Sequence, residues 1–207
     1  MSAPLSSPLL TQDQRDVLQE VANIGMGQAG ASIAKVFDHF VHLSIPRILF
    51  VPPSEVPAAL AQTVGGGVVS AVRQAFNNAL SGEAIVIFNS RRCNDLADLL
   101  GYDPDLDHAG EVELLLDVGN ILVGACLGGM AEQLKLSLGF SAPSLMADSV
   151  PLENLLNVKQ VAWDTALLVE VNFRLEERSF ACHLVMLLPG DQVGVLAQAL
   201  DRFLESL

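Results

Sequence analysis

The chain has 207 residues, of which 51% are hydrophobic and 17% are charged, and its formal net charge is −13. This length and hydrophobic content suit one compact domain, or two half-domains that share a core. The acidic balance argues against a nucleic-acid-binding protein, which needs a basic patch to displace counterions, and against binding to anionic membranes.

A long helix is the first element that the sequence predicts, from about residue 12 to Phe37. Thr11 is a suitable N-cap, and Gln14, three residues later, completes a capping box. One side of this helix is apolar and is expected to face a core. It comprises Val17, Leu18, Val21, Ala22, Ile24 and Ala29.

Another side of the same helix carries a polar stripe with little bulk. At about 100° per residue, Asp16, Glu20 and Asn23 lie within roughly 60° of one another. Gly27 and Gly30 continue the stripe. A carboxylate, an amide and two glycines form a face that the backbone of another molecule can approach closely.

The rest of the first half alternates strand and helix patterns between turn signals. We predict a strand at 42–50, a short helix to about 62, a hairpin of strands 68–76 and 83–88, and a helix from 90 to about 100. The segment 101–104, Gly-Tyr-Asp-Pro, is the best candidate boundary, and we expect a hinge there rather than a flexible linker.

The second half repeats this order. It is predicted to contain a helix at 108–136, a strand at 143–147, a short helix at 151–156, strands at 169–175 and 180–188, and a helix at 189–204. Apolar and polar residues alternate from Val169 to Glu176, which is typical of a half-buried strand.

The polar stripe itself also occurs twice, ninety-seven positions apart. This offset places Glu20 on Asp117, Asn23 on Asn120, Gly27 on Gly124 and Pro46 on Pro143, and twenty-two residues separate each Asn from its Pro. Four matched positions without a gap indicate an internal repeat, of about residues 11–102 and 107–204. We therefore expect an α+β fold with pseudo-twofold symmetry and a largely antiparallel β-sheet flanked by helices.

Several other patterns have simpler explanations. Gly25 to Gly30 matches G-x-G-x-x-G, but no strand precedes it, so close packing of the helix, or close approach by a partner, explains these glycines better than a dinucleotide site. The four histidines have no metal-ligand spacing with the cysteines, so no metal site is expected. The cysteines are odd in number and mostly in apolar settings, which favours buried free thiols; they are Cys93, Cys126 and Cys182.

The chain has no predicted membrane segment. Its most hydrophobic stretch, Leu114 to Ala131, contains Asp117 and Asn120, which a lipid-spanning helix rarely carries without partners. Residues 1–10 lack the basic start and apolar run of a signal peptide. We therefore expect a soluble, cytoplasmic protein without membrane insertion.

The repeated stripe resembles the signature of a known family. Asp16-x3-Glu20-x2-Asn23-x22-Pro46 is similar to the motif of the CheC/CheX/FliY chemotaxis phosphatases, and the two-copy layout resembles the CheC type. In the second copy Glu113 stands at the leading position and Asp117 replaces the Glu, while Asn120 and Pro143 are kept. The resemblance covers nearly the whole chain and implies a single CheC-like domain over residues 1–207.

The resemblance implies hydrolysis of the aspartyl-phosphate of a CheY-type response regulator. The regulator supplies the phosphorylated Asp, a Mg²⁺ and a Lys, so this chain needs no cofactor of its own. An amide can accept from a water and donate to a phosphoryl group, so Asn23 and Asn120 would position the attacking water. Glu20 and Asp117 would bind the regulator's Lys. The supporting residues would be Asp16 and Glu113, as contacts or capping partners, and Pro46 and Pro143, which would fix the turn or strand packed beside the helix.

A different class of function stays open. The chain could be a binding or adaptor module for a response regulator, or for a CheD-like deamidase, with little turnover of its own. The Glu20/Asn23 pair favours turnover, whereas the substituted second copy weighs slightly against it.

Overall fold

The computed structural model describes most of the chain. The described residues are 10–39, 41–52, 55–64, 67–89, 97, 100, 102, 106–155, 166–175 and 181–206. The predicted helix at 90–100 and boundary at 101–104 fall mostly outside this set, and Cys93 lies outside it.

Within the described residues, the helices and strands follow the predicted order, except that two strands stand where one was predicted at 42–50 and that β5 was not predicted. The helices are α1 (Gln12–Phe37), α2 (Val56–Val64), α4 (His108–Gln133), α5 (Leu152–Leu155) and α6 (Gly190–Leu204). The strands are β1 (Val41–Leu43), β2 (Arg47–Val51), β3 (Val68–Asn78), β4 (Gly82–Asn89), β5 (Leu138–Phe140), β6 (Ser144–Pro151), β7 (Ala166–Leu175) and β8 (Ala181–Pro189).

All eight of these strands form one sheet, and every pairing in it is antiparallel. The order is β1-β7-β8-β4-β3-β5, with β2 also paired to β7 and β6 also paired to β3. The α+β fold with an antiparallel sheet is therefore confirmed.

The two repeats exchange their short strands. β1 and β2, from the first repeat, pair with β7 of the second, whereas β5 and β6, from the second repeat, pair with β3 of the first. Adding ninety-seven to the bounds of β1 gives those of β5, and adding it to the start of β2 gives the start of β6. The sheet is thus built from both repeats at each end.

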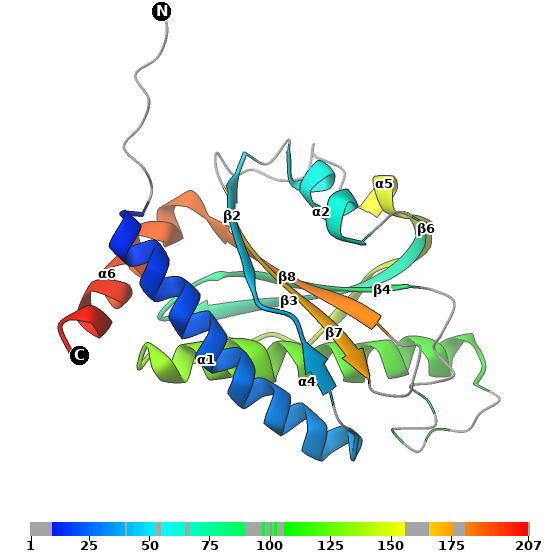
Figure 1. The fold of residues 1–207 in the computed structure, drawn as a ribbon. Coiled ribbons are helices and arrows are strands. Elements are labelled where there is room, and N and C mark those ends of the chain that lie inside the picture. The colour runs from blue at the N-terminus through cyan, green and yellow to red at the C-terminus, as the bar shows by residue number, and fades with distance from the viewer. Residues whose placement is uncertain are drawn as a thin grey trace, which may run out of the picture.

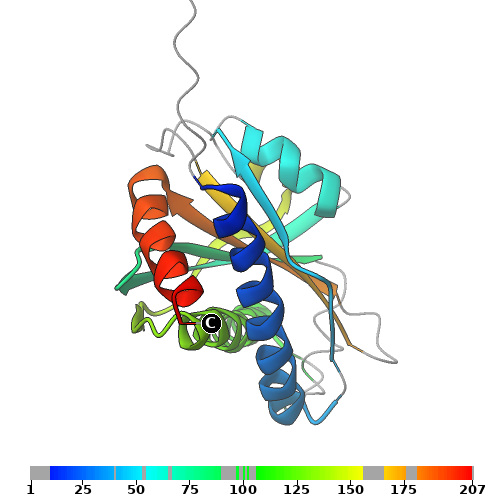
Figure 2. The same cartoon turned by 60° about the vertical axis from the view of Figure 1, so that its left-hand side comes forward.

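The helices cover the two faces of the sheet unequally (Figures 1 and 2). The long helices α1 and α4 cross on one face with α6 beside α1, and the short helices α2 and α5 lie on the other. Each face of the sheet has its own hydrophobic core. The central strand β4 contributes side chains to both cores, because its side chains alternate between the two faces. Ala84, Val86 and Phe88 join the core under α1 and α4, and Ile85 and Ile87 join the smaller one.

Glycines allow α1 and α4 to approach closely. A Cβ on Gly25 would lie 2.7 Å from the backbone nitrogen of Met130, and one on Gly129 would lie 2.5 Å from the carbonyl oxygen of Gly25. The backbone of Gly25 in α1 therefore packs directly against the backbone of α4. This is the close packing expected of the G-x-G-x-x-G stretch. Gly27 differs, since a Cβ there would meet nothing within 4 Å.

Hydrogen bonds confirm the predicted start of α1, but several boundaries differ from the prediction. Thr11 and Gln14 form both halves of the capping box. The predicted strand 42–50 is wrong as one element, because residues 44–46 interrupt it between β1 and β2. Pro46 lies in this interruption and has no N–H for a strand ladder. The helix predicted to reach 136 ends at Gln133, because Lys135 has a φ of 53° and turns the chain into β5.

The hydrophobicity of α4 is explained by its place in the core. Among the described helices, α4 alone has the length and apolar composition of a membrane span, and 61% of its most apolar window is buried inside the fold. Two thiols are buried free cysteines as predicted, and burial raises the pKa of both Cys126 and Cys182.

Candidate functional site

The first copy of the motif lies on the exposed side of α1. Asp16, Glu20 and Asn23 are all exposed, while Val17 and Val21 on the same helix are buried. The Asp16 carboxylate accepts a hydrogen bond from Gln12 Nε2 at 2.8 Å, within the helix. Among the described residues, no hydrogen bond or ion pair engages the Glu20 carboxylate, which is therefore available to a partner.

Asn23 lies beside the loop that carries Pro46. Gln19, one helical turn before Asn23, donates from Nε2 to Asn23 Oδ1 at 3.1 Å and to the carbonyl oxygen of Pro46 at 3.1 Å. Pro46 is buried, whereas the neighbouring Ile45 is 78% exposed. The signature Asn and Pro, far apart in sequence, are thus brought together by one glutamine.

The twenty-two-residue spacing of the motif follows from this geometry. From Asn23 the helix runs on to Phe37, about 21 Å at 1.5 Å per residue. Asp38 then takes a left-handed conformation with φ of 51°, and the chain returns beside α1 through β1. Five extended residues from β1 cover roughly 16 Å, so the loop at Pro46 arrives near the turn that presents Asn23.

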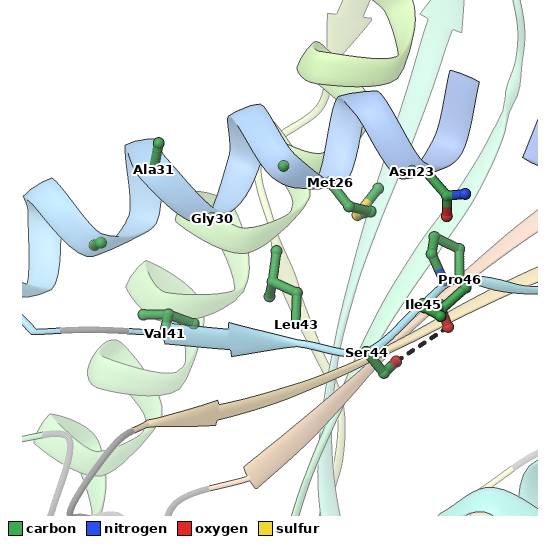
Figure 3. A pocket seen from close by; sticks show the side chains of 11 residues that line it. Asn23, Met26, Gly30, Ala31, Val41, Leu43, Ser44, Ile45 and Pro46 are labelled. Atoms are coloured by element: carbon green, nitrogen blue, oxygen red, sulfur yellow. Dashed lines mark hydrogen bonds between the residues drawn. The ribbon is translucent and has the colours of Figure 1, made fainter. Parts of the chain in front are cut away.

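An open groove of about 500 Å³ adjoins Asn23 (Figure 3). Its walls come from α1 and from the chain that returns through β1. The lining residues are Asn23, Met26, Gly27, Gly30, Ala31, Ala34, Val41, Leu43, Ser44, Ile45 and Pro46. Small residues on α1 leave this space, so a partner can approach the helix backbone beside the asparagine.

The second copy presents the same residue types from α4. Glu113, Asp117 and Asn120 are exposed, and Pro143 is half-buried in the loop between β5 and β6. A glutamine again connects the asparagine to that loop, but it comes from β3. Gln74 Nε2 donates to Asn120 Oδ1 at 2.8 Å and to the carbonyl oxygen of Ser141 at 2.8 Å.

Asp117 differs from Glu20 because it is already engaged. The hydroxyl of Tyr102 donates to Asp117 Oδ2 at 2.7 Å. This hydrogen bond raises the pKa of Tyr102 to about 12, with smaller contributions from partial burial and from the negative charges of Asp117 and Glu113. The second carboxylate is therefore held towards Tyr102.

The structure places each predicted Asn beside the loop of its predicted Pro, and it shows three further residues in contact with the predicted site residues that sequence reasoning missed. Gln19 had a sequence signal, because it stands four positions before Asn23 on a helix. Gln74 and Tyr102 had none, since they are distant in sequence from Asn120 and Asp117. No group of three or more histidines, cysteines, aspartates or glutamates within the described residues could hold a metal ion.

The chemistry available at each copy is that of an uncharged amide beside a carboxylate on an exposed helix. An amide can hold a water and a phosphoryl oxygen at the same time, and a carboxylate one turn away can bind a cation. These groups suit a reaction whose charged reactants come from a partner molecule.

Comparison with solved structures identifies the fold. Thermotoga maritima FliY has a TM-score of 0.71 at 16% identity, covering 95% of this chain and 100% of that one. The FliM middle domain from H. pylori has a TM-score of 0.61 at 9% identity, covering 92% of this chain and 99% of that one. The chain therefore has the fold of the FliY and FliM proteins.

Sequence comparison adds a more specific likeness. The chain is 26% identical to the CheY-P phosphatase CheC of Bacillus subtilis (strain 168) over 208 residues, covering 94% of this chain and 97% of that protein. No family model matches the chain. These likenesses confirm the resemblance to the CheC-like family over nearly the whole length.

Proposed function

We propose that this protein is a phosphatase for the aspartyl-phosphate of a CheY-type response regulator, acting in the cytoplasm. The observation that supports it best is the repeated exposed Asn, held beside its Pro-containing loop on both long helices. The CheC relative, a CheY-P phosphatase, supports the same substrate class.

The reaction requires little chemistry from this chain. A water attacks the phosphorus, the bond between phosphorus and the regulator's aspartate oxygen breaks, and the products are free aspartate and inorganic phosphate. In the proposed complex the Mg²⁺ and Lys of the regulator stabilise charge on the phosphoryl oxygens. Asn23 and Asn120 orient the water in line with the bond that breaks, and they add no charge.

Glu20 has a docking role in this proposal. Its exposed carboxylate binds the regulator's active-site Lys, which fixes the distance between the helix and the phosphoryl group. Asp117 would take the same role in the second copy. The groove beside Asn23 accommodates the backbone of the regulator, since Gly27 and Gly30 leave its floor without bulk.

The alternative is a binding module without turnover. The same fold occurs in H. pylori FliM, which forms a complex with SpeE, so the fold by itself does not require catalysis. A response regulator or a CheD-like deamidase would be the bound partner. The exposed Glu20/Asn23 pair favours the phosphatase, because a purely structural surface has no need of an oriented amide.

Turnover distinguishes the two functions. The protein is added at one-twentieth of the concentration of a CheY-type regulator from the same organism, phosphorylated with acetyl phosphate, and phosphate release is timed. A phosphatase is expected to release phosphate from all of the regulator. Release that stops at the amount of added protein, or that equals the spontaneous rate with every such regulator, would instead indicate a binding module.

A further inference from the structure

Both motif asparagines share their side-chain oxygen with a glutamine that also binds the adjoining loop. Gln19 connects Asn23 to the carbonyl of Pro46, and Gln74 connects Asn120 to the carbonyl of Ser141. The two glutamines do not correspond in the repeat, since Gln19 lies on the helix of its asparagine and Gln74 lies on a strand of the other repeat. The same arrangement is thus built twice from different positions.

The backbone carbonyl fixes the orientation of both amides at each site. A carbonyl oxygen can only accept, so the glutamine must turn its nitrogen towards it. That nitrogen has two hydrogens, and the second one points to the asparagine, which must therefore turn Oδ1 inwards. As a result, Asn23 and Asn120 direct Nδ2 away from the glutamine and keep one lone pair of Oδ1 free.

We infer that Gln74 and Gln19 are positioning residues that hold the catalytic asparagines in the orientation needed for hydrolysis. This inference rests on the proposed phosphatase function. With Oδ1 held by the glutamine, Nδ2 donates to a phosphoryl oxygen and the free lone pair of Oδ1 accepts from the attacking water. A rotated amide would exchange donor and acceptor and would no longer align the water.

The burial of Gln74 indicates that it serves the site rather than stability. It is 2% exposed, and its strand neighbours on the same face, Val72 and Phe76, belong to the main core. Among the described residues, its Oε1 is buried without a hydrogen-bond partner. A buried unpaired oxygen is unfavourable, and an apolar side chain of similar size would avoid it. The two hydrogen bonds from Nε2 are what the apolar side chain could not supply.

Gln19 holds its asparagine less firmly than Gln74. Gln19 is half-buried on the helix surface, and both of its hydrogen bonds are 3.1 Å long, whereas both of those from Gln74 are 2.8 Å long. Water can replace an exposed hydrogen bond more easily than a buried one. Removal of Gln74 should therefore disturb Asn120 more than removal of Gln19 disturbs Asn23.

Side-chain amide NMR tests the positioning without any assay of activity. In Gln74→Met, which keeps the volume and removes both donors, the order parameter of the Asn120 NH₂ group is expected to fall. Gln19→Met should lower that of Asn23 to a smaller extent. Gln198→Met, at an exposed position on α6, is the control for the substitution. Equal order of both asparagine amides in all variants would overturn the inference, and Gln19→Met keeps it testable if Gln74→Met fails to fold.

Kinetics of variants that keep only one of the two motif asparagines then test whether the glutamines affect catalysis. In an Asn23→Ala background, Gln74→Met should lower kcat about 10-fold or more with KM little changed, because misplacement of about 1 Å can cost roughly 100-fold. The loss should be much smaller in an Asn120→Ala background. Equal losses in both backgrounds would indicate damage to the whole fold and would overturn the inference. No turnover by the unsubstituted protein would reject the phosphatase function and, with it, any catalytic purpose of the glutamines.

Discussion

At the scale of single residues, the two copies differ most in their carboxylates. Asp117 is one methylene shorter than Glu20, so its carboxylate falls more than 1 Å short of the same target, roughly one C–C bond. The structure adds a second difference, because Tyr102 donates to Asp117 while Glu20 is exposed and without a hydrogen bond among the described residues. Both differences favour the first copy as the more active site.

Single substitutions of the asparagines test this order of activity. Asn23→Ala is expected to remove most turnover, because loss of one oriented transition-state contact costs about 10²–10³ in rate. Asn120→Ala should have little effect, and Asp117→Glu should raise the rate. Phosphate release from a phosphorylated regulator measures all three. If Asn120→Ala is the more damaging change, the argument from carboxylate reach is wrong.

Titration of Tyr102 tests the hydrogen bond at the second copy directly. It is the only tyrosine in the chain, so tyrosinate absorbance reports this residue alone. We expect a pKa of about 12 in the folded protein and a fall towards about 10 in Asp117→Ala. Because folding raises the pKa of Tyr102, the contribution of its hydrogen bond to the stability of the fold is fully present below about pH 10. This contribution is lost as the pH rises through about 12. Titration near 10 in both proteins would show that the bond is absent in solution.

The same interaction affects docking in the proposed phosphatase. Tyr102→Phe releases Asp117 without changing the helix, so KM for the second site should fall if the carboxylate then reaches the regulator's Lys. An Asn23→Ala background isolates that site. An unchanged KM would mean that Tyr102 does not compete with the regulator.

At the scale of elements, the crossing of α1 and α4 determines how both motifs are presented. Gly129→Ala is expected to destabilise the protein by about 1–3 kcal/mol, because its Cβ would lie 2.5 Å from the carbonyl oxygen of Gly25. Gly128→Ala is the matched control, since a Cβ there meets nothing within 4 Å and alanine should gain up to about 1 kcal/mol in a helix. Urea unfolding with an unchanged m-value measures both. Equal stability of the two variants would contradict close packing at this crossing.

At the scale of the whole molecule, strand exchange makes each repeat depend on the other. β1 and β2 have their strand partner β7 in the second repeat, and β5 and β6 have β3 in the first. The main core also takes residues from both α1 and α4, among them Leu18 and Val118. We therefore propose that residues 1–207 form one domain in which neither half has a complete sheet.

Separate expression of the two repeats tests this dependence. Residues 11–102 and 107–204, each alone, should show no cooperative unfolding, whereas an equimolar mixture should regain a single transition. Circular dichroism during thermal unfolding measures this, with the intact chain as the control. A cooperative transition in either isolated half would show that the repeats are independent domains.

The sequence by itself determined the features that depend on local periodicity and on duplication. Apolar spacing located α1 and α4, the capping box marked the start of α1, and the repeated Asn and Pro predicted an asparagine site on each helix. The predictions of the helices succeed because a helical face is specified by residues three and four positions apart. The asparagine sites and their catalytic role stay predictions.

Only the tertiary structure decided what surrounds the two asparagines. Gln74 reaches Asn120 across 46 positions, and Tyr102 reaches Asp117 across 15, through the fold rather than through any motif. The exchange of strands between the repeats could not be predicted from the sequence either. Antiparallel pairing depends on which strand edges the packed helices leave open, and not on the strand sequences alone. Contacts between distant segments cost chain entropy, which is offset only by the packing of the complete core. No local sequence pattern therefore encodes them.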